Sequence, residues 1–132
     1  MTKDDLRAYR EQKRELADLR EELEELTESM QAPGSNLDGM PHEPGRGDAM
    51  ERAVARKIEL EEMYAAKMEA LCAAITRVEN AIESLPPREK TVLRAYYIRG
   101  LKWEEVCIVT HYSWKHVHRL HAAALRALEK MT

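Results

Sequence analysis

The chain has 132 residues, 34% of them charged, with seven aromatic side chains and no Phe; this composition excludes one large core and favours long, solvated helices with narrow apolar seams. The net charge of −3 is uneven, since residues 1–31 and 32–85 each carry −4 whereas residues 86–132 carry 9 basic and 4 acidic side chains, a net +5. A basic end on an acidic body is expected when only that end approaches a polyanion.

The N-terminal segment 1–31 is predicted to be an acidic, coiled-coil-forming segment, and its residues 3–31 to form one helix. Its apolar residues recur at alternating steps of three and four, the spacing of a coiled coil, and are Leu16, Leu19, Leu23, Leu26 and Met30. Because an isolated apolar stripe does not stabilise a helix in water, this segment needs a partner helix.

A flexible linker is predicted over residues 32–48, which hold four of the five glycines and three of the five prolines. A longer helix follows over residues 49–84, within the segment 49–85, and Asp48 is its expected N-cap. Its predicted seam is Val54, Tyr64, Met68, Leu71, Ile75, Val78, Ile82 and Leu85, and the charged residues Lys57 and Glu61 interrupt it near the start. The two seams can be buried against each other in an antiparallel hairpin, or between chains in a dimeric coiled coil.

The pair Pro86-Pro87 ends the second long helix and begins another over 87–99, with Gly100 as its C′ residue. A short helix over 102–110 and a final helix over 114–131 follow, and Ser113 is the predicted N-cap of the last one. The predicted fold is therefore all-α: two long coiled-coil-forming helices followed by a helix-turn-helix domain over 86–132.

The helix-turn-helix is predicted from the apolar positions on the last two helices. In such a pair, two helices cross about a short turn and need small or aliphatic residues between them. The residues expected to face inward are Val106, Cys107, Val109, Val117 and Leu120, with Tyr112 filling the turn.

With those positions buried, the start of the last helix faces outward. The outward residues are Trp114, Lys115, His116, His118 and Arg119. An α-helix fits the DNA major groove, where Lys115 and Arg119 can donate to guanine or to phosphate. Ser113 and the helix N-terminus can hold a phosphate group.

Residues 85–131 resemble region 4 of bacterial sigma factors, and in particular the C-terminal domain of phage-encoded transcriptional regulators of the ArpU/RinA type. The residues that carry the resemblance are Leu85-Pro86-Pro87-Arg88-Glu89, Val92-Leu93, Tyr97-Ile98, Gly100-Leu101, Trp103-Glu104-Glu105-Val106, Ser113, Val117, Leu120 and Leu125. The layout of the whole chain, an acidic helix, a Gly/Pro linker and a second helix leading into the basic end, is also similar to those phage proteins.

The resemblance implies a sequence-specific regulator that binds double-stranded DNA, with RNA polymerase as a partner. The residues aligned with the groove-facing positions of the family are Trp114, Lys115, His116, His118 and Arg119. Lys102 and Trp103 align with positions that face the DNA backbone, and Arg88 is a further phosphate contact. The chain departs from the family at two positions: His111 replaces the usual turn glycine, and Trp114 replaces a long polar side chain.

Two other functions fit the same pattern. A phage DNA-packaging subunit of the small-terminase kind also joins a helix-turn-helix to helical oligomerisation segments. A helical adaptor protein without DNA contact is the second alternative, because fold does not fix function. For the regulator we expect a homo-oligomer, a dimer, through the long helices, and for the packaging subunit a ring of many copies.

No enzyme is expected, because no nucleophile is paired with a base in a known pattern and no Gly-rich phosphate loop is present. The pairs His118/His121 and Cys107/His111 have helical spacing but lack further ligands, so no metal or other cofactor is expected. The histidines are instead expected near phosphates, with binding that strengthens below about pH 6.5. A charged N-terminus, no long apolar run and two separate cysteines favour the cytoplasm and no membrane. The resemblance to phage regulators implies that this is the cytoplasm of a bacterial host.

Overall fold

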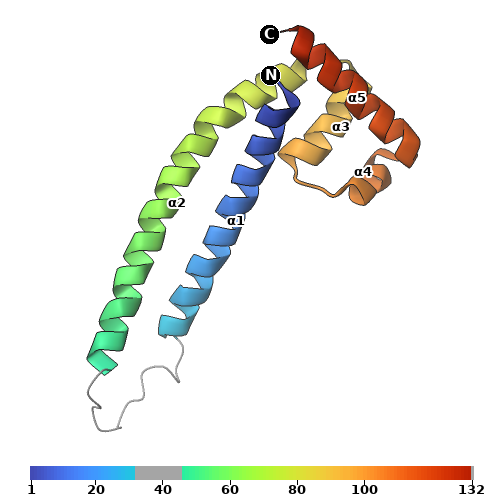
Figure 1. Ribbon diagram of the computed structural model, residues 1–132. Coiled ribbons are helices and arrows are strands. Elements are labelled where there is room, and N and C mark those ends of the chain that lie inside the picture. Colours follow the sequence, from blue (N-terminus) through green and yellow to red (C-terminus); the bar gives the residue numbers. More distant parts are fainter. Residues whose placement is uncertain (32–45, 132) are drawn as a thin grey trace. The chain divides into compact units, whose positions relative to one another are not determined.

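The structure, a computed structural model, describes residues 1–31 and 46–131, and every regular element in these ranges is helical (Figure 1). The prediction of an all-α fold is confirmed. The elements in chain order are α1 (Lys3–Gln31), α2 (Arg46–Glu83), α3 (Pro87–Leu93), the π-helical turn η2 (Arg94–Ile98), α4 (Trp103–Thr110) and α5 (Trp114–Lys130).

The helix ends follow the sequence closely, with one difference at α2. This helix begins at Arg46, so Asp48 lies in its first turn and is not the N-cap that we predicted. A carboxylate in the first turn still interacts favourably with the helix dipole. Of the predicted linker over 32–48, residues 46–48 are helical and the remainder lies outside the described residues.

The chain packs as two units, whose boundaries fall within α1 and α2. One unit combines Met1–Arg14 with Ala70–Thr132, and the other is Glu15–Glu69. The sequence placed the first turns of α1 with the acidic stalk, whereas they pack in the unit that holds the helix-turn-helix. None of the helices in the described part of the chain combines the length and the apolar character that a membrane crossing needs.

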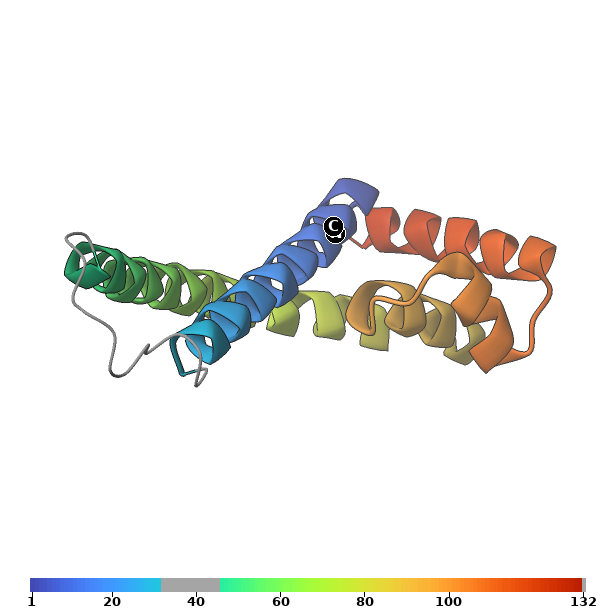
Figure 2. The same ribbon diagram turned by 90° about the horizontal axis from the view of Figure 1, so that it is seen from below.

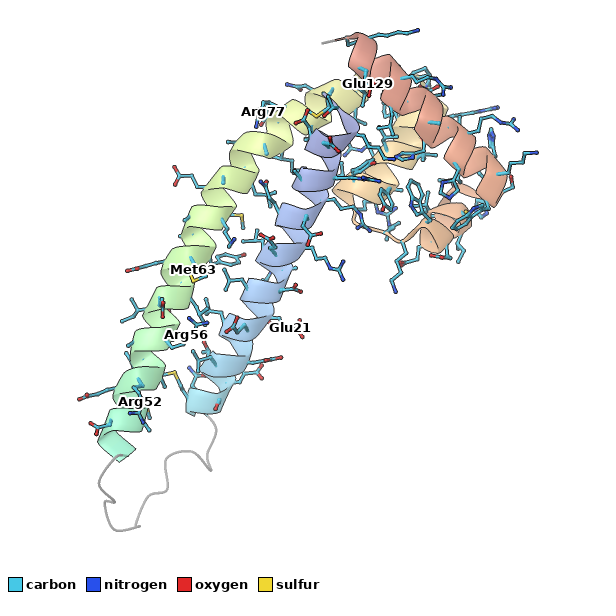
Figure 3. The ribbon with its side chains drawn as sticks, viewed as in Figure 1. Glu21, Arg52, Arg56, Met63, Arg77 and Glu129 are labelled. Atoms are coloured by element: carbon cyan, nitrogen blue, oxygen red, sulfur yellow. The ribbon has the colours of Figure 1, made fainter. Side chains whose placement is uncertain are left out.

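Within the unit Glu15–Glu69, α1 and α2 pair as an antiparallel hairpin. Arg56 of α2, labelled in Figure 3, places Nη2 3.2 Å from Oε1 of Glu22, and Lys67 Nζ lies 3.4 Å from Oε2 of Glu15. The residue later in α1 pairs with the residue earlier in α2, so the two helices run antiparallel. The buried residues of this hairpin include Leu16, Leu19 and Leu60. The two seams are thus covered within one chain.

In this hairpin Tyr64 of the predicted α2 seam is packed as expected, but Val54 and Met68 are not, and Leu60 is buried instead. Val54 and Met68 are 41% and 37% exposed, whereas Leu60 is only 1% exposed and Lys57 and Tyr64 are half-buried. Lys57 was taken as an interruption because of its charge, but its aliphatic stem can pack on the seam while the ammonium group reaches solvent. The packed stripe therefore runs through a lysine.

The other unit has its core between α3, α4, α5 and the adjoining ends of α1 and α2. Figure 2 shows α5 lying alongside α3 and α4. The residues of this core that are under 5% exposed include Leu6, Tyr9, Ile82, Leu85, Val92, Leu93, Tyr97, Val106, Val117, Ala124 and Leu128. Val106 and Val117 are buried as predicted, but Val109 is 45% exposed, so its expected inward position is wrong.

The turns of this unit use the residues that the sequence indicated. Gly100 has φ +71° after η2, and the left-handed conformation there suits a residue without Cβ. His111 closes α4 with φ +60°, the position at which a glycine is usual. Ser113 begins α5 as its N-cap, since its Oγ accepts a hydrogen bond from the His116 amide over 3.1 Å.

Candidate DNA-binding surface

The start of α5 presents two cations to solvent. Lys115 and Arg119 are both exposed, and no described residue forms an ion pair with either of them. They lie four residues apart and so occupy one face of the helix. Ser113 and the first amides of α5 lie at the same end. The exposure of both cations agrees with the outward positions that the sequence predicted, and an α-helix with such a face fits the DNA major groove.

Trp114 and His118 lie on the flank of that face. Trp114 is 51% exposed, and its ring centre lies 4.5 Å from that of His118. His118 is half-buried because Trp103 covers its other side, with ring centres 4.7 Å apart. His116 turns the other way and lies edge-on against Tyr112 at 4.9 Å. His116 therefore packs on the turn between the helices and is less outward than we predicted.

Trp103, which we predicted to face the DNA backbone, lies half-buried in an aromatic cluster. Its ring stacks on that of Tyr96, with centres 3.8 Å apart and planes within 10° of parallel. Lys102 beside it is exposed, and its backbone amide donates to Glu105 Oε1 over 3.1 Å, which helps to start α4. Lys102 thus remains available to a phosphate, whereas Trp103 is committed to the aromatic cluster.

Residues 81–130 match the family model of Sigma-70, region 4. The match begins in the last turn of α2 and ends with the last residue of α5, and so covers the whole helix-turn-helix. This segment is a sigma-region-4-like helix-turn-helix. The comparison with curated proteins found no match, and the comparison with solved structures found none either.

The region-4-like domain belongs to a class that binds DNA, and its surface carries that chemistry. Arg88, the second residue of α3 and a predicted phosphate contact, is exposed. The domain also lies within the segment of net charge +5, while the rest of the chain carries −8. Electrostatic attraction to DNA is therefore concentrated in this domain.

His121 is half-buried and contacts a buried residue of the core. Its Nε2 lies 2.8 Å from the hydroxyl of Tyr97. Burial, together with the nearby charges of Lys3, His118 and Arg7, lowers the pKa of His121 to about 4. Burial raises the pKa of Tyr97 to about 12, so the hydroxyl keeps its proton at neutral pH and shares a hydrogen bond with the neutral imidazole. The expected charging of the histidines near pH 6.5 therefore does not extend to His121.

One contact that organises this domain could not be predicted from any sequence pattern. Arg10 of α1 donates from Nε to the carbonyl oxygen of Tyr96 over 3.2 Å and from Nη2 to that of Leu101 over 3.3 Å. Its guanidinium also lies 4.2 Å from the centre of the Tyr96 ring. These contacts join residues about 90 positions apart, which no local pattern reveals. They attach the start of α1 to the region-4-like domain.

Within residues 1–31 and 46–131, no three His, Cys, Asp or Glu side chains are grouped closely enough to hold a metal ion. Cys72 is exposed and Cys107 is half-buried, and both are free thiols. The described surface thus carries cations and aromatic rings, which are groups that bind nucleic acid.

Proposed function

We propose that this chain is a sequence-specific, double-stranded DNA-binding transcription regulator encoded by a phage or prophage, and that α5 enters the major groove. The observation that carries the proposal is the exposure of Lys115 and Arg119, without ion-pair partners among the described residues, at the start of α5 in a region-4-like domain. Lys and Arg donate to the O6 and N7 atoms of guanine in that groove. The similar layout of the phage regulators supports the assignment to transcription.

The experiment is a selection on random duplexes, followed by affinity measurements for selected and scrambled sites at several salt concentrations. We expect an enriched site and an affinity that falls steeply with salt. Lys115→Ala and Arg119→Ala should each cost discrimination by about 1–3 kcal/mol, because base contacts specify sequence. The matched control is Arg126→Ala, an exposed cation on the same helix two turns beyond Arg119, which should leave discrimination unchanged.

Arg88→Ala provides the complementary result. A phosphate contact holds the domain in register without reading sequence, so its loss should weaken selected and scrambled duplexes about equally. The proposal is wrong if the selection enriches no site and if affinity is indifferent to Lys115→Ala and Arg119→Ala alike.

RNA polymerase and a second copy of this chain are the proposed protein partners, in the cytoplasm of a bacterial host. The homodimer is supported by apolar side chains that α2 leaves exposed after its seam is covered, which are Met50, Val54, Ile58, Met63 and Met68. Met50, Val54 and Ile58 follow one another at steps of four and so share one side of α2, and exposed apolar groups gathered in this way mark protein contacts. Sedimentation of the full chain should show a dimer, and a monomer at high concentration contradicts it.

The same mass measurement separates the packaging subunit from the regulator, because a packaging subunit should form a ring of many copies. An adaptor without DNA contact should leave the mobility of every duplex unchanged at low salt. The selection and the mass measurement together distinguish the three functions.

A further inference from the structure

We propose that Lys3 and Arg7 of α1 complete a phosphate-binding cleft on the flank of α5, and that this cleft holds a backbone phosphate of the bound DNA. The inference rests on the proposed DNA-binding function and extends the DNA contacts to a helix outside the family match. The sequence placed both residues in an acidic stalk, with no role in binding.

The cleft has a volume of about 230 Å³ and lies between α1 and the region-4-like domain. Lys3 and Arg7 line one side, and the rings of Tyr96, Trp103, His118 and His121 line the other. No carboxylate lines it, although the chain has 24 acidic residues. The cleft is therefore positive on one side and aromatic on the other, a combination that suits a phosphate next to a sugar or base.

The two cations are available to a ligand. Lys3 and Arg7 are exposed, and neither has an ion-pair partner among the described residues. Other cations of α1 and α2 are paired, for example Arg20 with Glu24 at 3.1 Å and Arg56 with Glu22 at 3.2 Å. Lys3 and Arg7 are four residues apart and so lie together on one face of α1.

His118 supplies an unused polar atom at the same place. Its Nε2 is buried and has no hydrogen-bond partner in the described structure. His118 is also the neighbour of Arg119 in sequence, so the cleft adjoins the face of α5 that meets the groove.

The start of α1 is held firmly enough to position these cations. Leu6 and Tyr9, on the turns between and after them, are 0% and 2% exposed. One turn beyond Arg7, Arg10 donates to the carbonyl oxygens of Tyr96 and Leu101. Lys3 and Arg7 are therefore presented by a docked helix, which reduces the entropy that a phosphate contact costs.

The test compares Lys3→Ala/Arg7→Ala with the control Arg14→Ala/Arg20→Ala in the full chain. The control removes two positive charges from the same helix, outside the cleft. Affinity for the selected duplex is measured across salt concentrations. One phosphate contact contributes about 0.9 to the slope of log K against log salt. We expect the cleft variant to lower the slope by about one and to keep sequence discrimination, while the control changes neither.

A second measurement identifies the source of the phosphate. The imidazole resonances of His118 and His121 are followed by NMR during titration with inorganic phosphate alone and with the duplex. The proposal predicts shifts with the duplex that the cleft variant loses. If inorganic phosphate moves these resonances while the cleft variant keeps the full salt slope, the cleft holds a free anion and the DNA contact is wrong.

Different results would contradict the phosphate-binding cleft and the proposed DNA-binding function. If Lys115→Ala weakens DNA binding but the cleft variant does not, the cleft proposal is wrong and the proposed function stands. If the unmodified chain binds no duplex, both are wrong. Should the alanine variant fail to fold by circular dichroism, Lys3→Gln/Arg7→Gln keeps the polar surface and gives the same comparison.

Discussion

The guanidinium of Arg10 lies 4.2 Å from the centre of the Tyr96 ring, and its Nε donates to the main-chain carbonyl oxygen of the same residue over 3.2 Å. One side chain of α1 thus binds both the ring and the backbone of η2. Tyr96 in turn stacks on Trp103, which contacts His118 on α5. The start of α1 is connected in this way to the helix that we expect in the DNA groove.

Arg10→Ala should therefore lower the free energy of unfolding of this unit by about 1–3 kcal/mol, because a charged donor and a cation–π contact are both lost. Arg10→Lys keeps the charge but not the planar guanidinium group, so its free energy of unfolding should lie between those of the unmodified chain and of Arg10→Ala. Urea unfolding followed by tryptophan fluorescence measures the effect, since both tryptophans, Trp103 and Trp114, lie in this unit. Arg14→Ala is the control, and an equal loss there would contradict the role of Arg10.

The stability of the region-4-like domain should depend on the protonation of His121. Its pKa is about 4 in the folded chain and about 6.5 when unfolded, so folding favours the neutral imidazole. The stabilisation is complete above pH 6.5 and is lost as the pH falls toward 4, where the charged ring would face Lys3, Arg7 and His118. Melting temperatures between pH 7.5 and 4.5 should fall more steeply for the unmodified chain than for His121→Gln. Parallel curves would contradict this assignment.

The left-handed conformation of His111 should make this position sensitive to the shape of the side chain. The left-handed conformation destabilises a residue that has a Cβ by about 1–2 kcal/mol, whereas it does not destabilise Gly. His111→Gly should therefore unfold at equal or higher urea concentration than the unmodified chain, and the β-branched His111→Val at lower concentration. If His111→Gly is clearly destabilising, the imidazole makes a contact that outweighs the strain.

The hairpin of α1 and α2 should distinguish Leu60 from Val54. Leu60 is 1% exposed, so Leu60→Ala should cost about 2–5 kcal/mol through lost burial and a cavity. Val54 is 41% exposed, and Val54→Ala should change stability by less than about 1 kcal/mol in dilute, monomeric protein. Thermal unfolding followed by circular dichroism compares the two variants. If both variants lose equal stability, Val54 is packed in the hairpin as we predicted from the sequence.

Much of the fold follows from local sequence signals. Ser113, Gly100 and the two prolines before α3 mark helix ends because their chemistry acts within one turn, and the structure places the ends there. Part of the seam of α2 was predicted wrongly because Lys57 was read as polar, although its stem packs on the apolar stripe. The exposed cations of α5 were predicted from the position of Val117, whose burial fixes the opposite face.

The contacts of Trp103 and Arg10 could not be predicted in this way. Trp103 was placed toward the DNA backbone by alignment with the family, but its stacking on Tyr96 depends on how η2 turns. Arg10 reaches residues about 90 positions away, and its helix carries no pattern that identifies a partner. Long-range polar contacts of single side chains leave no periodic trace in the sequence.

The wide turn η2 also bears on how this segment tolerates insertions and deletions. The amide of Arg99 donates to the carbonyl oxygen of Arg94, five residues back, where an α-helix would use the fourth. A π turn is equivalent to one additional residue inside a helix, so removing a residue from 94–98 could restore regular α-helical geometry without shortening the backbone path greatly. Such a deletion would rotate Tyr96 and Tyr97 by about 100° relative to α4. The resulting helix would be more regular, but it would lose the contact of Tyr96 with Arg10 and that of Tyr97 with His121.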